Sequence, residues 1–240
     1  MKTKFAGTRY SPLIAREESH EVGTVVQFRR RLLKRLKELS DESGKNAFRM
    51  PVGLFLVVDR ENGGDATAQE LTSRFNLIDL ESRNVIDFYF LGWSKNSSGN
   101  IAFDPNGFSD CRNFLKQSGI KEFGGNADLI LVDAVRHESG SVTLDFQHAI
   151  RIDLSTRKAE KGFPTLGSFL ESIIAAAQAV KDDVHRATAT GTVFAISDRL
   201  GIAIAKDSIL NFILEKWGKI IGARKLKELA VTNLGPSLEI

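Results

Sequence analysis

Two stretches of the chain are apolar on both faces, which predicts central strands of a sheet that is covered by helices on each side. They run over residues 52–59 and 127–133, and each ends in an aspartate, Asp59 and Asp133. Another strand is predicted over residues 85–93, which are rich in the aromatic residues that suit a sheet surface. These three strands predict a sheet-centred fold.

Helical periodicity appears between and around the strands. Residues 25–39 place apolar side chains at three- and four-residue steps on one face, and Gly44 can end this helix. Three further helices are predicted, over residues 66–75, 109–118 and 165–185. Residues 94–107 read as a loop because they contain turn chemistry, including Asp104-Pro105-Asn106-Gly107.

A turn at residues 137–141 leads into a strand that alternates between apolar and polar positions. The alternation predicts one buried face, formed by Leu144, Phe146, His148, Ile150 and Ile152. One face is wet, so this is expected to be an edge or antiparallel strand. On this pattern His148 is interpreted as a core histidine with one hydrogen-bond partner.

The predicted fold class is α/β: a mixed sheet of four to six strands flanked by helices, with helical extensions at both ends. Residues 1–50 are expected to form an arm and a basic amphipathic helix, and residues 51–188 the α/β core. Residues 189–240 are expected to hold a hairpin or helix at 190–206. An amphipathic helix that packs on the core or on a partner follows it.

The composition is that of a globular protein. Of 240 residues, 42% are hydrophobic and 26% charged, and no apolar stretch reaches the roughly 18 residues that would suggest a membrane span. We therefore expect no membrane partner, and no secretion signal is visible. A single cysteine, Cys111, excludes an internal disulfide and favours the reducing cytoplasm. The net charge of +3 does not by itself demand a nucleic-acid partner.

Over residues 52–185 the predicted order is strand, helix, strand, helix, strand, strand, helix, and this order resembles the thioredoxin-like superfold. The resemblance implies that the strands beginning at Val52 and Ala127 are antiparallel. It also places a redox motif at residues 60–65, which contain no cysteine, and a cis-proline at residues 123–126, which contain no proline. It therefore implies a scaffold without thiol–disulfide chemistry.

The leading functional hypothesis is a cytoplasmic, non-redox binding module within a larger assembly, acting through a protein partner or by self-association and needing no cofactor. Residues 79–93 and 124–133 resemble uncharacterised bacterial modules encoded beside conflict-system NTPases, which implies a bacterial defence-type assembly. The helix from about residue 207 carries the apolar anchors of such an interface. These anchors are Ile213, Trp217 and Ile220.

An enzyme is the first alternative. If the strands from Val52 and Ala127 run parallel, Asp59 and Asp133 emerge at one sheet edge and could hold Mg²⁺ and a phosphate ester or nucleotide. If the strands are antiparallel, the two residues lie at opposite ends, and aspartates that end strands commonly serve turns instead. Cys111, in the first turn of a helix, could be a nucleophile or a small apolar core residue.

Nucleic-acid binding is the second alternative. The helix at residues 25–39 carries a dense basic cluster, formed by Arg29, Arg30, Arg31, Lys34 and Arg35. Such a stripe would contact phosphates in a salt-sensitive, sequence-independent way. The same cluster also suits a solvated helix face balanced by acidic neighbours. The histidines show no spacing typical of metal ligands.

Overall fold

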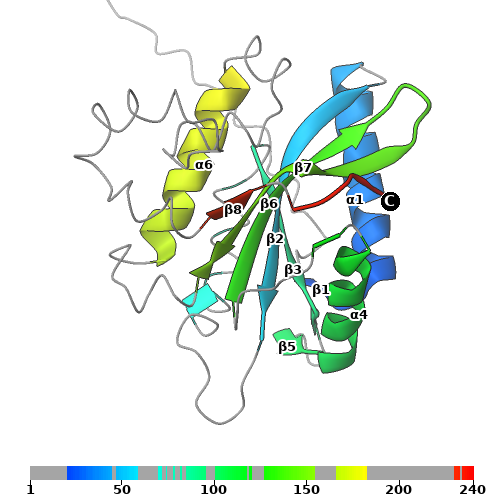
Figure 1. Ribbon diagram of the computed structural model, residues 1–240. Coiled ribbons are helices and arrows are strands. Elements are labelled where there is room, and N and C mark those ends of the chain that lie inside the picture. The colour runs from blue at the N-terminus through cyan, green and yellow to red at the C-terminus, as the bar shows by residue number, and fades with distance from the viewer. Residues whose placement is uncertain are drawn as a thin grey trace, which may run out of the picture.

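The computed structural model describes residues 21–44, 47–58, 70–71, 74, 78, 82, 85–95, 101–117, 119–120, 127–154, 166–182, 230–232 and 234–240. Within these residues a mixed β-sheet is flanked by helices on both faces (Figure 1). The predicted α/β fold class is thereby confirmed.

Four strands of five or more residues form the centre of the sheet. They are β2 (Phe48–Val57), β3 (Asp87–Leu91), β6 (Ala127–Arg136) and β7 (Val142–Asp153). Short strands β1 (Glu21–Val22), β8 (Ala230–Thr232) and β9 (Leu238–Glu239) flank them. The sheet order is β1-β3-β2-β6-β7-β8, and β9 also pairs with β7. Strand β3 is parallel to β2, whereas β6 is antiparallel to both β2 and β7.

Among the described residues, α-helices of twelve or more residues cover both faces of the sheet, two on one face and one on the other. α1 (Val25–Ser43) and α4 (Pro105–Lys116) share a core with the first face, to which α1 contributes Phe28, Leu32 and Leu36. α6 (Leu166–Asp182) contributes Phe169, Leu170 and Ile173 to the core of the opposite face. Both cores are apolar, which explains why β2 and β6 read as apolar on both faces.

The ends of α1 follow from local chemistry. The Thr24 side chain accepts a hydrogen bond from the backbone N–H of Gln27 at 3.2 Å, which caps the first turn. Gly44 ends the helix with φ of 64°, a left-handed conformation that glycine adopts without strain. The predicted stop at Gly44 is therefore confirmed.

The start of α4 was predicted wrongly, at residue 109. Asp104 caps the helix by accepting a hydrogen bond from the backbone N–H of Asn106 at 3.0 Å, and Pro105 occupies the first helical turn. The segment that reads as a turn is therefore a helix start, because an acidic cap followed by proline serves both purposes. Two short strands precede α4 in the chain. They are β4 (Trp93–Lys95) and β5 (Ile101–Phe103), and they pair with each other.

The predicted strand at residues 85–93 is interrupted at Gly92, which has φ of 80° and separates β3 from β4. A side chain at position 92 would collide with Phe108 of α4, so the close approach of these two segments also requires glycine.

The prediction that one face of β7 holds five buried residues is wrong. In the pairing with β6, the two residue steps from Leu131 to Asp133 correspond to the five steps from Ile150 back to Asp145, so β7 bulges. The bulge changes which face each residue occupies. Leu144 and Phe146 pack in the core beneath α1, whereas Ile150 and Ile152 pack beneath α6, and His148 is exposed.

Several predictions concern residues outside the described part of the chain. These are the arm at 1–20, the segment at 190–206 and the helix from about residue 207. Of the predicted helix at 66–75, Glu70 and Leu71 are helical and Leu71 is buried. The proposed division at residue 50 falls within β2, and β1, β8 and β9 join the sheet from near the chain ends. None of the described helices has both the length and the hydrophobicity needed to cross a membrane.

Candidate functional site

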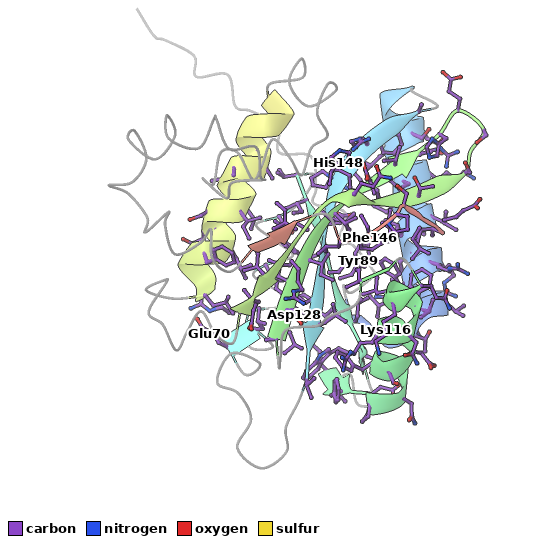
Figure 2. The ribbon with its side chains drawn as sticks, viewed as in Figure 1. Glu70, Tyr89, Lys116, Asp128, Phe146 and His148 are labelled. Carbon is purple, nitrogen blue, oxygen red and sulfur yellow. The ribbon has the colours of Figure 1, made fainter. Side chains whose placement is uncertain are left out.

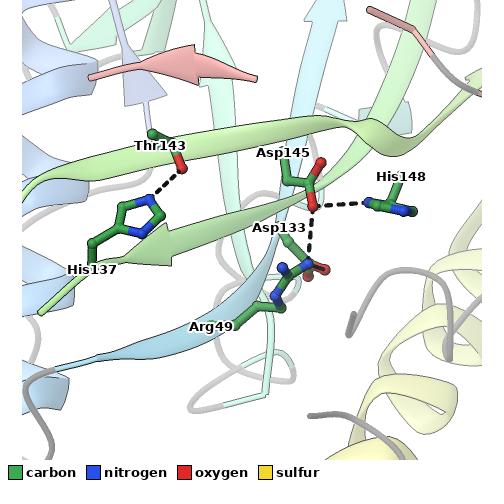
Figure 3. A network of polar contacts seen from close by, with 6 residues as sticks. All are labelled: Arg49, Asp133, His137, Thr143, Asp145 and His148. Atoms are coloured by element: carbon green, nitrogen blue, oxygen red, sulfur yellow. Dashed lines mark hydrogen bonds and ion pairs between the residues drawn. The ribbon is translucent and has the colours of Figure 1, made fainter. Parts of the chain in front are cut away.

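A polar network connects three neighbouring strands on the sheet face opposite α1 (Figure 3). Arg49 of β2 uses one nitrogen, Nη1, to contact Oδ2 of Asp133 in β6 and Oδ2 of Asp145 in β7, each at 3.0 Å. His148 of β7 contacts the same oxygen of Asp145 through Nδ1 at 2.9 Å. We call these four residues the β2–β6–β7 network.

The register of the sheet explains why these side chains meet. Asp133 and Asp145 are direct cross-strand partners, and Arg49 pairs with Val135, two positions along the same face from Asp133. Two carboxylates directly opposite each other would repel. The guanidinium of Arg49 lies between them and offsets this repulsion.

This arrangement also corrects the predicted end of β6. The sequence predicts that the strand ends at Asp133, whereas β6 continues to Arg136. A buried carboxylate is compatible with a strand interior when a cation on the next strand neutralises it. Arg49 supplies that cation, so Asp133 does not serve a turn.

Exposure to solvent increases across the network. The side chain of Asp133 is 0% exposed and that of Asp145 is 10% exposed, whereas Arg49 is 33% and His148 is 48% exposed. The two carboxylates thus form the buried floor, and the imidazole is the part most accessible to a ligand. In Figure 2, His148 lies at the end of the sheet away from Asp128 and Glu70.

The network keeps Asp145 and Arg49 charged. Burial alone would raise the pKa of Asp145, but the hydrogen bond and charge of His148, followed by those of Arg49, outweigh burial and lower it. Burial alone would likewise lower the pKa of Arg49, but Asp133 and Asp145 outweigh it and raise that pKa. Asp145 is therefore a carboxylate at neutral pH.

The ionised state of Asp145 fixes the role of each nitrogen in His148. A carboxylate can only accept hydrogen bonds, so Nδ1 must donate. In the neutral imidazole, Nε2 then carries the lone pair. The interpretation of His148 as a core histidine is wrong because its side chain, in the bulged stretch of β7, is exposed, although its one predicted hydrogen-bond partner is present.

His137 offers a comparison within the same hairpin. It is exposed, and its Nε2 lies 3.0 Å from the hydroxyl of Thr143 (Figure 3). His137 thus makes its contact through Nε2 and to a neutral hydroxyl, whereas His148 makes its contact through Nδ1 and to a carboxylate. A carboxylate partner orients an imidazole and makes it more reactive, so the two histidines differ in this respect.

The predicted pairing of Asp59 with Asp133 depended on parallel strands, and β2 and β6 are antiparallel. Val57, the last residue of β2, pairs with Ala127, whereas Asp133 pairs with Pro51. Asp59 lies outside the described residues. Within the described ranges, no group of three or more histidine, cysteine or acidic side chains is arranged to hold a metal ion.

The predicted basic cluster on α1 is divided by the fold. Arg35 points to the sheet and forms an ion pair with buried Asp87, with Nε 3.1 Å from Oδ2. Arg29 lies over the ring of Phe114, 5.0 Å from its centroid. Arg30 and Lys34 are exposed and Arg31 is half-buried.

The solvent side of α1 carries an unusual combination of residues. Val26 is 75% and Leu33 is 38% exposed, and they are the exposed large hydrophobic side chains of the described residues. They are seven positions apart, so they lie on one side of the helix together with exposed Arg30 and Lys37. We call Val26, Arg30, Leu33 and Lys37 the α1 outer face.

Cys111 lies in the core beneath α1 and is 1% exposed. Burial raises the pKa of its thiol to about 12, so the thiol stays protonated and out of contact with solvent. These properties fit a small apolar core residue and not a nucleophile. The predicted interface residues Ile213, Trp217 and Ile220 lie outside the described part of the chain.

Sequence reasoning did not single out Arg49 or Asp145. Arg49 sits in a segment that reads as the approach to a strand, and Asp145 as one of several polar residues on a wet face. Only the cross-strand register joins them. A scan against protein-family models, a search of curated proteins and a search of solved structures found no match to this chain.

Proposed function

We propose that this protein is a non-redox binding module that docks an acidic protein partner on the α1 outer face. The observation that carries this proposal is the exposure of Val26 and Leu33 between Arg30 and Lys37. Apolar side chains next to cations suit a partner surface that offers both apolar and acidic groups. The dense packing of the inner side of α1 on the sheet holds this face rigid.

A protein partner fits this face better than a nucleic acid does. Of the five basic residues predicted to bind phosphates, Arg29 lies over the ring of Phe114 and Arg35 pairs with Asp87. Arg31 and Lys34 also interact within the protein. Exposed Glu38 and Asp41 lie on the same helix, and acidic groups there oppose phosphate contacts. If the protein instead binds nucleic acid through Arg30, Arg31 and Lys34, that function would replace the one proposed.

The scaffold and location are part of the same proposal. A thioredoxin-like arrangement is supported by the antiparallel pairing of β2 with β6, which the resemblance requires. Loss of redox chemistry is supported by the burial of Cys111. A cytoplasmic location and a bacterial defence-type assembly rest on the sequence alone.

Site-specific photo-crosslinking in cells that naturally produce the chain tests the proposal. A benzophenone amino acid replaces Val26 or Leu33 in the full chain, and the matched control carries it at exposed Gln147 on β7. We expect one discrete crosslinked protein from positions 26 and 33, none from position 147, and loss of the product after Arg30→Glu. Its identification by mass spectrometry should reveal an acidic contact surface.

Three outcomes would contradict the proposal. Crosslinked products that disappear on nuclease treatment would favour nucleic-acid binding. A product made of two copies of this chain would replace the acidic partner by self-association. Equal, diffuse crosslinking from all three positions would mean that α1 is an ordinary solvated helix face.

A further inference from the structure

The β2–β6–β7 network extends from its buried ion pairs to an imidazole at the surface. Arg49 contacts both carboxylates, at 3.0 Å from each. His148 adds a half-exposed imidazole to Asp145, and it lies in the bulged stretch of β7 between Asp145 and Ile150. Bulges that redirect a side chain are over-represented beside active sites.

We propose that His148, oriented by Asp145, is a nucleophilic imidazole that attacks the acyl carbon of small, uncharged ester substrates. Asp145 accepts the hydrogen bond from Nδ1, so the lone pair of neutral His148 lies on Nε2, the nitrogen that does not face the carboxylate. A buried carboxylate in this position also stabilises the positive charge that develops on the ring during attack. His148 is thus the catalytic residue, and Asp145 and Arg49 are positioning residues.

The charge of the network selects the class of substrate. The four residues of the network comprise two carboxylates, Asp133 and Asp145, and one guanidinium, so together they carry a net negative charge when His148 is neutral. A phosphate or carboxylate substrate would be repelled by this charge. An uncharged acyl ester carries no such penalty.

The reaction proceeds in two balanced steps. Nε2 forms a bond to the acyl carbon, the bond from that carbon to the alcohol oxygen breaks, and the alkoxide or phenolate leaves with the electron pair. Water then attacks the resulting acyl-imidazolium, and the carbon–nitrogen bond breaks with its electron pair returning to Nε2. The carboxylic acid leaves with one proton of the water, and the other proton passes through the solvent to the alkoxide or phenolate. The proton on Nδ1 stays in its hydrogen bond with Asp145 during both steps.

The first test uses p-nitrophenyl acetate as the probe and the full-length protein. We expect His148→Gln to lower the protein-dependent rate of p-nitrophenolate release at least about tenfold. The matched control, His137→Gln, removes an exposed imidazole of the same hairpin that contacts the hydroxyl of Thr143. It should leave the rate within about twofold of the parent protein.

The second test needs no folding-sensitive variant of the catalytic residue. Diethyl pyrocarbonate, which transfers an acyl group to imidazole, is applied to the unaltered protein, and peptide mass spectrometry follows each histidine. His148 should be modified at least about fivefold faster than His137. Asp145→Asn should slow modification of His148 but not of His137 in the same sample, a selectivity that general loosening of the fold would not give.

The result that would overturn the proposal is equal reactivity of the two histidines, together with equal loss of ester hydrolysis from His148→Gln and His137→Gln. The network would then be structural only. This inference does not depend on the proposed binding function, because His148→Gln leaves the α1 outer face intact. Crosslinking from position 26 in the His148→Gln variant therefore tests the binding function separately. A crosslinked product without ester hydrolysis, or ester hydrolysis without a product, would show which of the two proposals fails.

Discussion

Arg49→Met removes the single cation of the β2–β6–β7 network while keeping most of the apolar volume of the side chain. Breaking a buried ion pair by removing one partner destabilises proteins by about 3–5 kcal/mol, mainly because the remaining charge loses its compensation. Asp133 is 0% exposed, but Arg49 is 33% exposed, so water replaces part of what the variant loses. We therefore expect a loss of about 3 kcal/mol in the free energy of unfolding, at the lower end of that range.

The effect of Arg49→Met should depend on pH in a defined direction. The pKa of Asp145 is lowered in the folded protein, with contributions from both His148 and Arg49. A lowered folded-state pKa stabilises the protein above the unfolded value of about 3.9, and this stabilisation is lost as pH falls through the folded value. The difference between parent and variant should thus be largest near neutral pH and shrink below about pH 4.

Urea denaturation followed by circular dichroism, repeated from neutral to acidic pH, measures both effects. Arg30→Met is the matched control, because Arg30 is exposed on α1 and its loss should change stability by no more than about 0.5 kcal/mol. The argument is refuted if Arg49→Met and Arg30→Met have the same effect at neutral pH. It is also refuted if the loss caused by Arg49→Met is unchanged in acid.

Three further predictions concern the packing of the fold. Gly53→Ala would place a Cβ against the ring of Phe88 on β3, so it should lower stability by about 1–3 kcal/mol, and an unchanged melting temperature would contradict this. Because burial raises the pKa of Cys111 to about 12, Ellman's reagent should label this thiol only after unfolding in guanidinium, and rapid labelling of the native protein would disprove its burial. Arg35→Met should destabilise by about 3 kcal/mol in urea because it removes the cation 3.1 Å from buried Asp87, and a neutral effect would mean that Arg35 serves the surface instead.

Much of the fold could be predicted from local pattern. Burial on both faces makes β2 and β6 recognisable as apolar stretches. Contacts between residues a few positions apart make α1, α6 and the turn between β6 and β7 recognisable. The pattern failed where one local signal serves two structures. Asp104-Pro105 suits a turn and a helix start equally well, and only packing of α4 on the sheet selects the helix.

The β2–β6–β7 network could not be predicted from the sequence, for a different physical reason. A bulge in β7 has no fixed residue signature, yet it moves every later side chain to the other face, so strict alternation wrongly joins Leu144 with Ile150. The interpretation of His148 depended on that alternation. For the same reason, the basic residues of α1 look alike in the sequence, although Asp87, 52 positions away from Arg35, decides which of them faces inward.

The positions of the charges connect these observations. A carboxylate in the interior of a strand, such as Asp133, is destabilising unless a cation from another strand reaches it, so its presence already implies a long-range partner. Arg49 meets that requirement for Asp133 and extends it to Asp145, and Asp145 in turn holds the half-exposed imidazole of His148 in one orientation. A carboxylate that orients an imidazole and fixes its tautomer activates that imidazole, so His148 is where reactivity should be sought. That argument makes the comparison of His148 with His137 the most informative one in this molecule, because the two imidazoles share the hairpin and the solvent and differ in the carboxylate.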